Sequence, residues 1–149
     1  MALPEPVPGL VISYAYLWHD QSRRGLTEGH KDRPCAIVVT TKDQDGDTIV
    51  YVVPITHAPP SEGSRVVELP ATAKRRLGLD DAPSWIVTSE LNRFVWPGYD
   101  LRPVSRDMPD TFAWGFLPVE TFAAVKRAIG LNQGNYDLKV VARDVTFEP

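Results

Sequence analysis

The chain of 149 residues contains a single cysteine, Cys35, so no disulfide can form within it. Sparse use of cysteine is typical of the reducing cytoplasm, where we expect this protein to be located. The longest strongly apolar stretch, residues 49–55, falls far short of the roughly 20 residues that a membrane-spanning helix needs. The sequence therefore predicts no membrane association.

Motifs for cofactors and metals are also missing. The sequence contains no glycine-rich phosphate loop, no dinucleotide-binding fingerprint and no nucleophile elbow. Its histidines, His19, His30 and His57, have neither the spacing of a zinc-binding helix nor paired cysteines. We expect no cofactor and no metal site. Cys35, at the start of an apolar run, is interpreted as a buried and inert thiol.

The charge balance excludes a protein that binds nucleic acid through a general positive field. The formal net charge is −3, whereas non-specific nucleic-acid binding depends on neutralising phosphates. Any contact with RNA or DNA must therefore be local. Basic residues do gather between Arg23 and Arg33 and again at Lys74, Arg75 and Arg76, although solvated surface charge is the commoner explanation of such a cluster.

Short strands at close intervals dominate the predicted secondary structure. Apolar, β-branched and aromatic residues predict strands over residues 10–16, 35–41, 48–55, 65–69, 85–91, 101–104, 138–142 and 145–147. The Asp-Gly step at residues 45–46 predicts an antiparallel hairpin between the second and third of these. Helices are predicted over residues 71–77 and 119–129, each followed by a glycine, and residues 18–32 predict a long, mobile polar loop.

These elements fit one domain over residues 1–149, because domains cluster near about 100–150 residues. We expect a mainly β fold with minor α, in the form of a small curled β-barrel that carries one or two helices.

Four segments of the sequence carry a family signal. They are the strand after Gly9, the Arg33-Pro34 step before an apolar strand, the strand end Pro54-Ile55-Thr56, and residues 86–91 before a helix. In this order they resemble the MazF/PemK/Kid family of toxin ribonucleases from bacterial toxin–antitoxin pairs. The resemblance covers about residues 8–130 and leaves residues 131–149 as an extra tail.

The resemblance implies a fold, an activity and partners. The fold would be a small SH3-like (CcdB/MazF-type) β-barrel with a C-terminal helix, here extended by a strand-like tail, and the protein would be a homodimer. The activity would be that of a metal-independent endoribonuclease that cleaves single-stranded RNA through attack of the 2′-hydroxyl. A cognate antitoxin protein would inhibit it.

Four residues are the predicted catalytic groups. The planar guanidinium of Arg33 can hold two phosphate oxygens, and the resemblance implies that the Thr56 hydroxyl donates a hydrogen bond to the same phosphate. Histidine is the side chain best suited to carry protons near neutral pH, so His57 is a candidate proton carrier, with Glu90 as a second candidate.

Candidate RNA contacts are Lys31, Ser89, Asn92 and Arg93. Ser89 stands where many relatives have aspartate, and Val87 stands where some have a catalytic arginine. Two alternatives therefore stay open: a catalytically silent barrel that binds a protein partner, and a gyrase inhibitor on the related CcdB-like scaffold.

Overall fold

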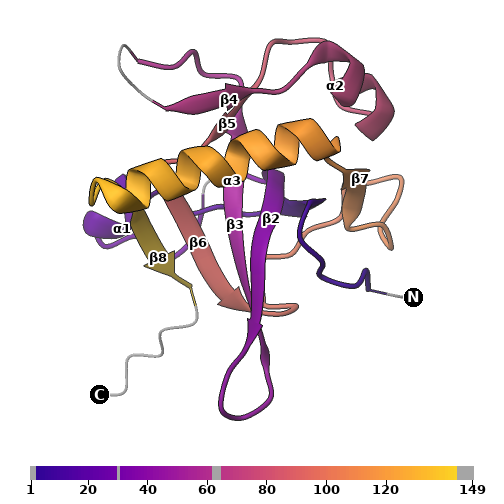
Figure 1. Cartoon of the computed structure of the whole chain (residues 1–149). Coiled ribbons are helices and arrows are strands. Elements are labelled where there is room, and N and C mark those ends of the chain that lie inside the picture. Colours follow the sequence, from indigo (N-terminus) through magenta and orange to yellow (C-terminus); the bar gives the residue numbers. More distant parts are fainter. Residues whose placement is uncertain (1–2, 30, 62–64, 144–149) are drawn as a thin grey trace.

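A computed structural model of the chain describes residues 3–29, 31–61 and 65–143. Within these residues the chain is mainly β with minor α, as the sequence predicts (Figure 1). His30 and residues 145–147 lie outside the described residues. The elements in chain order are β1 (Leu10–Tyr14), α1 (His19–Arg23), β2 (Arg33–Lys42), β3 (Thr48–Thr56), β4 (Val66–Glu68), α2 (Ala71–Leu77), β5 (Trp85–Val87), β6 (Glu90–Val95), β7 (Ala113–Phe116), α3 (Val119–Gly134) and β8 (Lys139–Ala142).

The strands form one sheet that branches at β3. Antiparallel β2 lies along one side of β3, and on the other side the first half of β3 pairs with β6 while its end pairs with β5. The path runs β4-β5-β3-β2-β1-β7, and β8 joins β6 in parallel. Among the described residues these pairings do not close into a ring.

The predicted hairpin between β2 and β3 is confirmed, and its turn is stabilised locally. The carboxylate of Asp43 accepts hydrogen bonds from the backbone N–H groups of Asp45 and Asp47, each at 2.9 Å. Gly46 has a φ of +84°, a left-handed conformation that glycine adopts without steric cost. The turn projects away from the body of the sheet (Figure 1).

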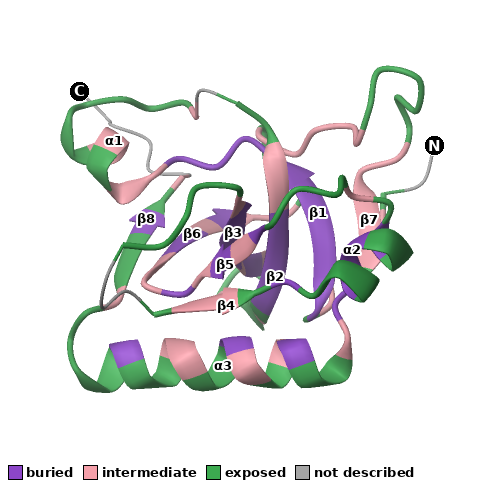
Figure 2. Cartoon of the chain, turned by 90° about the horizontal axis from the view of Figure 1, so that it is seen from above, coloured by how far each residue is buried: buried purple, intermediate pink, exposed green. Residues whose placement is uncertain are grey.

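One hydrophobic cluster lies between the sheet and the helices α2 and α3. Ala36 and Val38 of β2 face it, and Leu77 of α2 and Val125 of α3 close it from the other side. Figure 2 shows the buried and half-buried side of α3 turned toward the sheet, with its exposed side away from it. The helices therefore cover one face of β2 and β3.

A second hydrophobic cluster lies on the opposite face of the same strands. Cys35 and Ile37 alternate with the residues of the first cluster and point to this side. Tyr14 stacks on Phe94 there with ring centres 4.5 Å apart. Because β2 and β3 are buried on both faces, their sequences read as continuous apolar runs rather than alternating patterns.

The predicted strand over residues 85–91 is two strands, β5 and β6, with a break at Thr88 and Ser89. The Thr88 hydroxyl donates to the Arg65 carbonyl at 2.7 Å, and the Thr88 carbonyl accepts from the Asn132 amide at 2.8 Å. The same contact explains why α3 continues past Gly130 to Gly134: Asn132, in the added turn, is held against the sheet.

Three further predictions differ from the structure. Residues 101–104 form no strand, and only Leu101 makes an isolated bridge to Tyr14. The strand β7 was not predicted, because Gly115, at a φ of +137°, interrupts its pattern; it forms by pairing along β1. Residues 18–32 include the short helix α1.

The tail after α3 completes the sheet through β8, and the residue that follows is anchored. The side chain of Arg143 is 2% exposed, and its Nη2 lies 2.9 Å from Oδ2 of Asp100. Its Nη1 donates to the Ala15 carbonyl at 2.8 Å and to Oδ1 of Asn92 at 3.0 Å. Arg143 therefore joins the tail to the segment after β1.

Candidate active site

A pocket of about 130 Å³ lies at the end of the β2–β3 pair that is opposite the hairpin turn. Cys35 of β2 pairs with Pro54 of β3. Two residues beyond this pair, Arg33 at the start of β2 and Thr56 at the end of β3 both line the pocket. The segment from α2 to β5 forms the remaining wall. The lining residues are Lys31, Asp32, Arg33, Pro34, Ile55, Thr56, His57, Lys74, Leu79, Asp80 and Ser84.

Arg33 occupies the first position of β2 and is half-buried. Its guanidinium lies over the ring of Trp18, with Cζ 5.0 Å from the ring centre, a cation–π contact that fixes the side chain. Its Nε is buried and has no hydrogen-bond partner among the described residues. Burial lowers the pKa of the Arg33 guanidinium, yet an arginine stays charged at neutral pH. Arg33 lines the pocket, and a guanidinium in a pocket wall suits an anionic ligand.

Thr56 ends β3 and lies on the same pocket as Arg33. Its Oγ1 accepts a hydrogen bond from the backbone N–H of Ala58 at 3.1 Å. A hydroxyl that accepts in this way keeps its own hydrogen for donation. Thr56 can therefore donate to an oxygen of a ligand that Arg33 holds.

His57, Asp80 and Lys74 form a chain of polar contacts along one wall of the pocket. His57 follows β3 directly, and its Nε2 lies 3.0 Å from Oδ2 of Asp80. Oδ1 of Asp80 accepts from Nζ of Lys74 at 2.8 Å. The Lys74 side chain is 5% exposed, whereas those of Asp80 and His57 are 56% and 57% exposed. The hydrogen bond from Lys74 holds the pKa of Asp80 below its usual range, so Asp80 is a carboxylate at neutral pH.

The sequence did not identify Lys74 and Asp80 as site residues. In the sequence Lys74 stands in a basic cluster with Arg75 and Arg76, and of these three residues Lys74 is buried while the two arginines are exposed. Lys74 instead lies on the inward side of α2 with Ala73 and Leu77, which are buried. A lysine at helical spacing among apolar residues is the signal that could have found it. Asp80 gives no such signal, because it lies in a loop.

Of the predicted residues, the pocket brings together Lys31, Arg33, Thr56 and His57. Glu90 is not among its lining residues. Its Oε1 accepts from the Tyr16 hydroxyl at 3.0 Å and from the His19 backbone N–H at 2.9 Å. Burial, and then the nearby Glu90 carboxylate, raise the pKa of Tyr16 well above its usual value. Glu90 thus fixes the start of α1. It does not line the pocket, where a proton carrier would have to lie.

Asn92 is buried, with no exposed surface. Its Oδ1 accepts from the Leu17 backbone N–H at 2.9 Å, and its Nδ2 donates to the Leu17 carbonyl at 2.8 Å. An RNA contact needs an accessible side chain, so this position does not suit the predicted role. Asn92 instead holds the segment between β1 and α1 against β6.

Ser89 and Arg93 lie away from the pocket lining. The Ser89 carbonyl accepts from the Lys139 backbone N–H at 3.1 Å, at the junction between β5 and β6. Arg93 is in β6, where it pairs with Tyr51 of β3 and Ala142 of β8. Both residues are half-buried, and neither contributes to the pocket wall.

The described part of residues 18–32 is attached to the body of the molecule at several points. The His19 backbone N–H donates to Oε1 of Glu90 at 2.9 Å, and within the segment the Trp18 backbone N–H donates to Oε1 of Gln21 at 3.2 Å. Trp18 also packs edge-on against Tyr16, with ring centres 5.1 Å apart. Trp18 therefore presents an aromatic surface to Arg33, and the segment contains the helix α1 where the sequence predicted a long, mobile polar loop.

Cys35, in β2, is fully buried in the second hydrophobic cluster, as the sequence predicted. Burial raises the pKa of its thiol far above the ordinary value, so the thiolate that a nucleophile needs is not formed near neutral pH. Cys35 is therefore part of the hydrophobic core.

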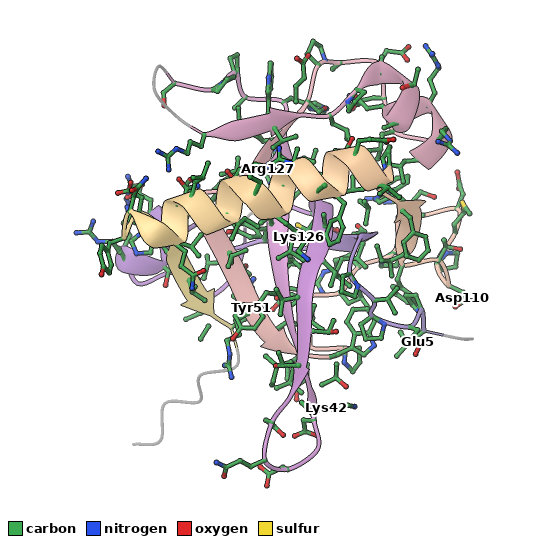
Figure 3. All side chains as sticks on the ribbon, in the orientation of Figure 1. Glu5, Lys42, Tyr51, Asp110, Lys126 and Arg127 are labelled. Atoms are coloured by element: carbon green, nitrogen blue, oxygen red, sulfur yellow. The ribbon has the colours of Figure 1, made fainter. Side chains whose placement is uncertain are left out.

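A larger hollow of about 510 Å³ lies below α3, where Tyr51 of β3 and Lys126 of α3 both line it (Figure 3). Its other described lining residues, which include Val38, Leu91 and Val140, are uncharged. It lacks the paired charges that phosphate chemistry requires, so the smaller pocket is the candidate active site.

Two features are absent from the part of the chain that the structure describes. No helix there is long and apolar enough to cross a membrane. No group of three or more His, Cys, Asp or Glu side chains is placed there to hold a metal ion.

Comparison with known proteins adds no match to these observations. No protein-family model matches the chain, and no curated protein matches its sequence. The case for a function therefore depends on the motifs at Arg33-Pro34 and Pro54-Ile55-Thr56 and on the pocket where they meet.

Proposed function

We propose that this chain is a metal-independent endoribonuclease of the MazF/PemK type, the toxin of a toxin–antitoxin pair, which cleaves single-stranded RNA through its 2′-hydroxyl. The observation that supports the proposal best is the meeting of Arg33, Thr56 and His57 at one pocket. Each supplies a group that this reaction requires: a cation for the phosphate, a hydroxyl donor and a proton carrier.

The phosphate of the scissile bond is held by positive charge. Arg33 donates from its guanidinium to the non-bridging oxygens, where negative charge grows as the fifth bond to phosphorus forms. Its contact with Trp18 limits the freedom of the guanidinium, so less entropy is lost on binding. Thr56 donates its hydroxyl hydrogen to the same phosphate, and exposed Lys31 attracts the flanking RNA backbone.

His57 moves the proton. It accepts the proton of the 2′-hydroxyl while the 2′-oxygen bonds to phosphorus and the bond from phosphorus to the 5′-oxygen breaks. The leaving 5′-oxygen takes a proton from water, and the imidazolium then returns its proton to the hydroxide that remains. The products are a 2′,3′-cyclic phosphate and a 5′-hydroxyl end, and the enzyme is unchanged.

The proposal extends to architecture and partners. It includes an SH3-like arrangement of the sheet with α3 as its C-terminal helix, a homodimer, a cognate antitoxin that blocks the pocket, and action in the cytoplasm. The support for the architecture is the branched β sheet with α3 lying across one face (Figures 1 and 2).

The test is incubation of the purified protein with single-stranded RNA in the presence of a chelator. We expect 5′-hydroxyl and 2′,3′-cyclic phosphate ends, and a rate at least about 100-fold lower for Arg33→Ala. Arg127→Ala, on the exposed side of α3, is the matched control and should cleave normally (Figure 3).

Two results would contradict the proposal. Cleavage that survives Arg33→Ala would overturn the mechanism. A wild-type protein that leaves RNA intact would overturn the activity, and a gyrase supercoiling assay would then separate the CcdB-like alternative from the protein-binding module.

A further inference from the structure

The contacts among His57, Asp80 and Lys74 join three separate parts of the chain. His57 follows β3, Lys74 is in α2, and Asp80 lies in the connection from α2 to β5. The His57 Nε2 lies 3.0 Å from one carboxylate oxygen of Asp80 and 3.1 Å from the other. The imidazole is therefore held by both oxygens of a single carboxylate.

Lys74 is committed to this arrangement and has no donor left for a ligand. Its Nζ donates to Oδ1 of Asp80 at 2.8 Å, to Oγ of Ser84 at 2.7 Å and to the carbonyl of Ala82. Three acceptors match the three N–H donors of an ammonium group. Although Lys74 lines the pocket, its buried charge acts on RNA only through Asp80.

The ionised carboxylate of Asp80 determines which ring nitrogen of His57 carries the hydrogen. A carboxylate only accepts hydrogen bonds, so the Nε2 that contacts it must carry a hydrogen. In a neutral imidazole the other ring nitrogen, Nδ1, is then an acceptor with a free lone pair. The backbone N–H of Ala82 also donates to Oδ1 of Asp80, at 3.1 Å, which further fixes the carboxylate.

We propose that Asp80 is a positioning residue that keeps the proton of neutral His57 on Nε2, leaving Nδ1 as the atom that accepts the 2′-hydroxyl proton, and that Lys74 holds Asp80 in place. This inference rests on the proposed ribonuclease function and assigns to that site two residues outside the resembling motifs. The low pKa of Asp80 agrees with it, because the carboxylate stays ionised throughout the neutral range.

The main test is Asp80→Asn, which keeps the size of the side chain and an oxygen that can accept from Lys74. The substitution removes the carboxylate that partners the buried Lys74 ammonium, so circular dichroism and thermal unfolding will first establish that the variant is folded at the assay temperature. We expect kcat to fall about 100-fold, while KM and the binding of a non-cleavable 2′-deoxy analogue stay unchanged. Asp81→Asn, the neighbouring exposed carboxylate, is the control and should retain wild-type kcat.

A double substitution shows whether Asp80 acts through His57. If it does, His57→Ala/Asp80→Asn will be no slower than His57→Ala alone, because the group that Asp80 orients is already absent. An equal loss of rate from Asp80→Asn in both backgrounds would overturn the positioning role. So would a loss of RNA affinity with kcat intact.

Nuclear magnetic resonance gives a readout that is independent of activity. The nitrogen shifts of neutral His57 should report a hydrogen on Nε2 in the wild type, and this preference should weaken in Asp80→Asn and in Lys74→Met. A hydrogen on Nδ1 in the wild type would overturn the inference alone. A wild type with the expected tautomer but without RNA cleavage would instead overturn the proposed function, and with it the catalytic use of His57.

Discussion

The two ends of the β2–β3 pair differ in where their polar side chains find partners. At the hairpin end the contacts are local: Asp43 accepts from the backbone of its own turn, and Nζ of Lys42 donates to Oγ1 of Thr48 at 2.7 Å. At the pocket end the contacts are long-range, since Arg33 packs on Trp18 and His57 contacts Asp80. One end is assembled by neighbouring residues and the other by the whole fold.

The two ends of the β2–β3 pair also differ in which hydrogen-bond donors they leave without a protein acceptor. The turn satisfies its own backbone donors, whereas the pocket keeps a buried N–H of Arg33 without a partner among the described residues and a threonine hydroxyl that can still donate. Arg33 and Thr56 both line the pocket, so their side-chain donors are placed to serve a ligand there. Substitutions at the pocket end should therefore affect catalysis, and those at the hairpin end should affect stability alone.

Among the substitutions that compare the two ends of the β2–β3 pair, Arg33→Lys should have the largest effect. Lysine keeps the positive charge but loses the planar fork that holds two phosphate oxygens and stacks on Trp18. We expect the single-turnover rate of RNA cleavage to fall about 100-fold. The matched change at the other end, Lys42→Arg, should leave the rate unchanged. Equal rates for wild type and Arg33→Lys would show that only charge matters at this position.

A smaller effect is expected from Thr56→Val, which replaces the hydroxyl with a methyl group of similar size. The cleavage rate should fall about 10-fold, the effect of losing one hydrogen bond to a charged group. Thr48→Val removes a hydroxyl from the hairpin end of the same strand and is the control. If both variants cleave RNA at the same rate, the Thr56 hydroxyl has no part in the reaction.

The strands and helices were largely predictable because their signals are local. The hairpin followed from its Asp-Gly step, and α2 follows its predicted bounds, with Gly78 at a φ of +77° after its last residue. The errors arose where a distant contact decides the outcome. Residues 85–91 divide into two strands because β3 pairs with each part separately, and α3 passes Gly130 because Asn132 bonds to Thr88.

The candidate site was likewise predictable where local order places its residues, and not where distant contacts do. Arg33 begins β2, Thr56 ends β3 and His57 follows it, so the predicted hairpin between these strands brings the three residues to the same end of the strand pair. Asp80 reaches the pocket through a loop whose path depends on the packing of α2. The side chain of Asn92 is of a type that can contact RNA, but its amide instead holds Leu17. These two residues are 75 positions apart, so no local sequence pattern indicates the contact.

Stability above neutral pH should depend on Cys35, in the strand next to the pocket. Its pKa is raised by burial, so above about pH 8.5 the thiol ionises in the unfolded chain but not in the folded one. The contribution of the protonated thiol to the free energy of unfolding is complete below that pH. It is lost as pH rises, at up to about 1.4 kcal/mol per pH unit. Urea denaturation of the wild type between pH 8.5 and 9.5 should show this slope. Cys35→Ala should lack it, and equal slopes would show that the thiol ionises in the folded protein.

The smallest effect should come from Asp43→Ala in the hairpin turn. The substitution removes the acceptor for two backbone N–H groups, but these are exposed and water replaces the lost bonds. We expect the free energy of unfolding to fall by about 0.5–1 kcal/mol, measured by urea denaturation. Asp43→Asn keeps the oxygen and should restore most of it. RNA cleavage should be unchanged in both variants, because no contact of the turn extends to the pocket. Slower cleavage by a fully folded Asp43→Ala would show that the two ends of the strand pair are coupled, and that local partners do not isolate the turn from the site.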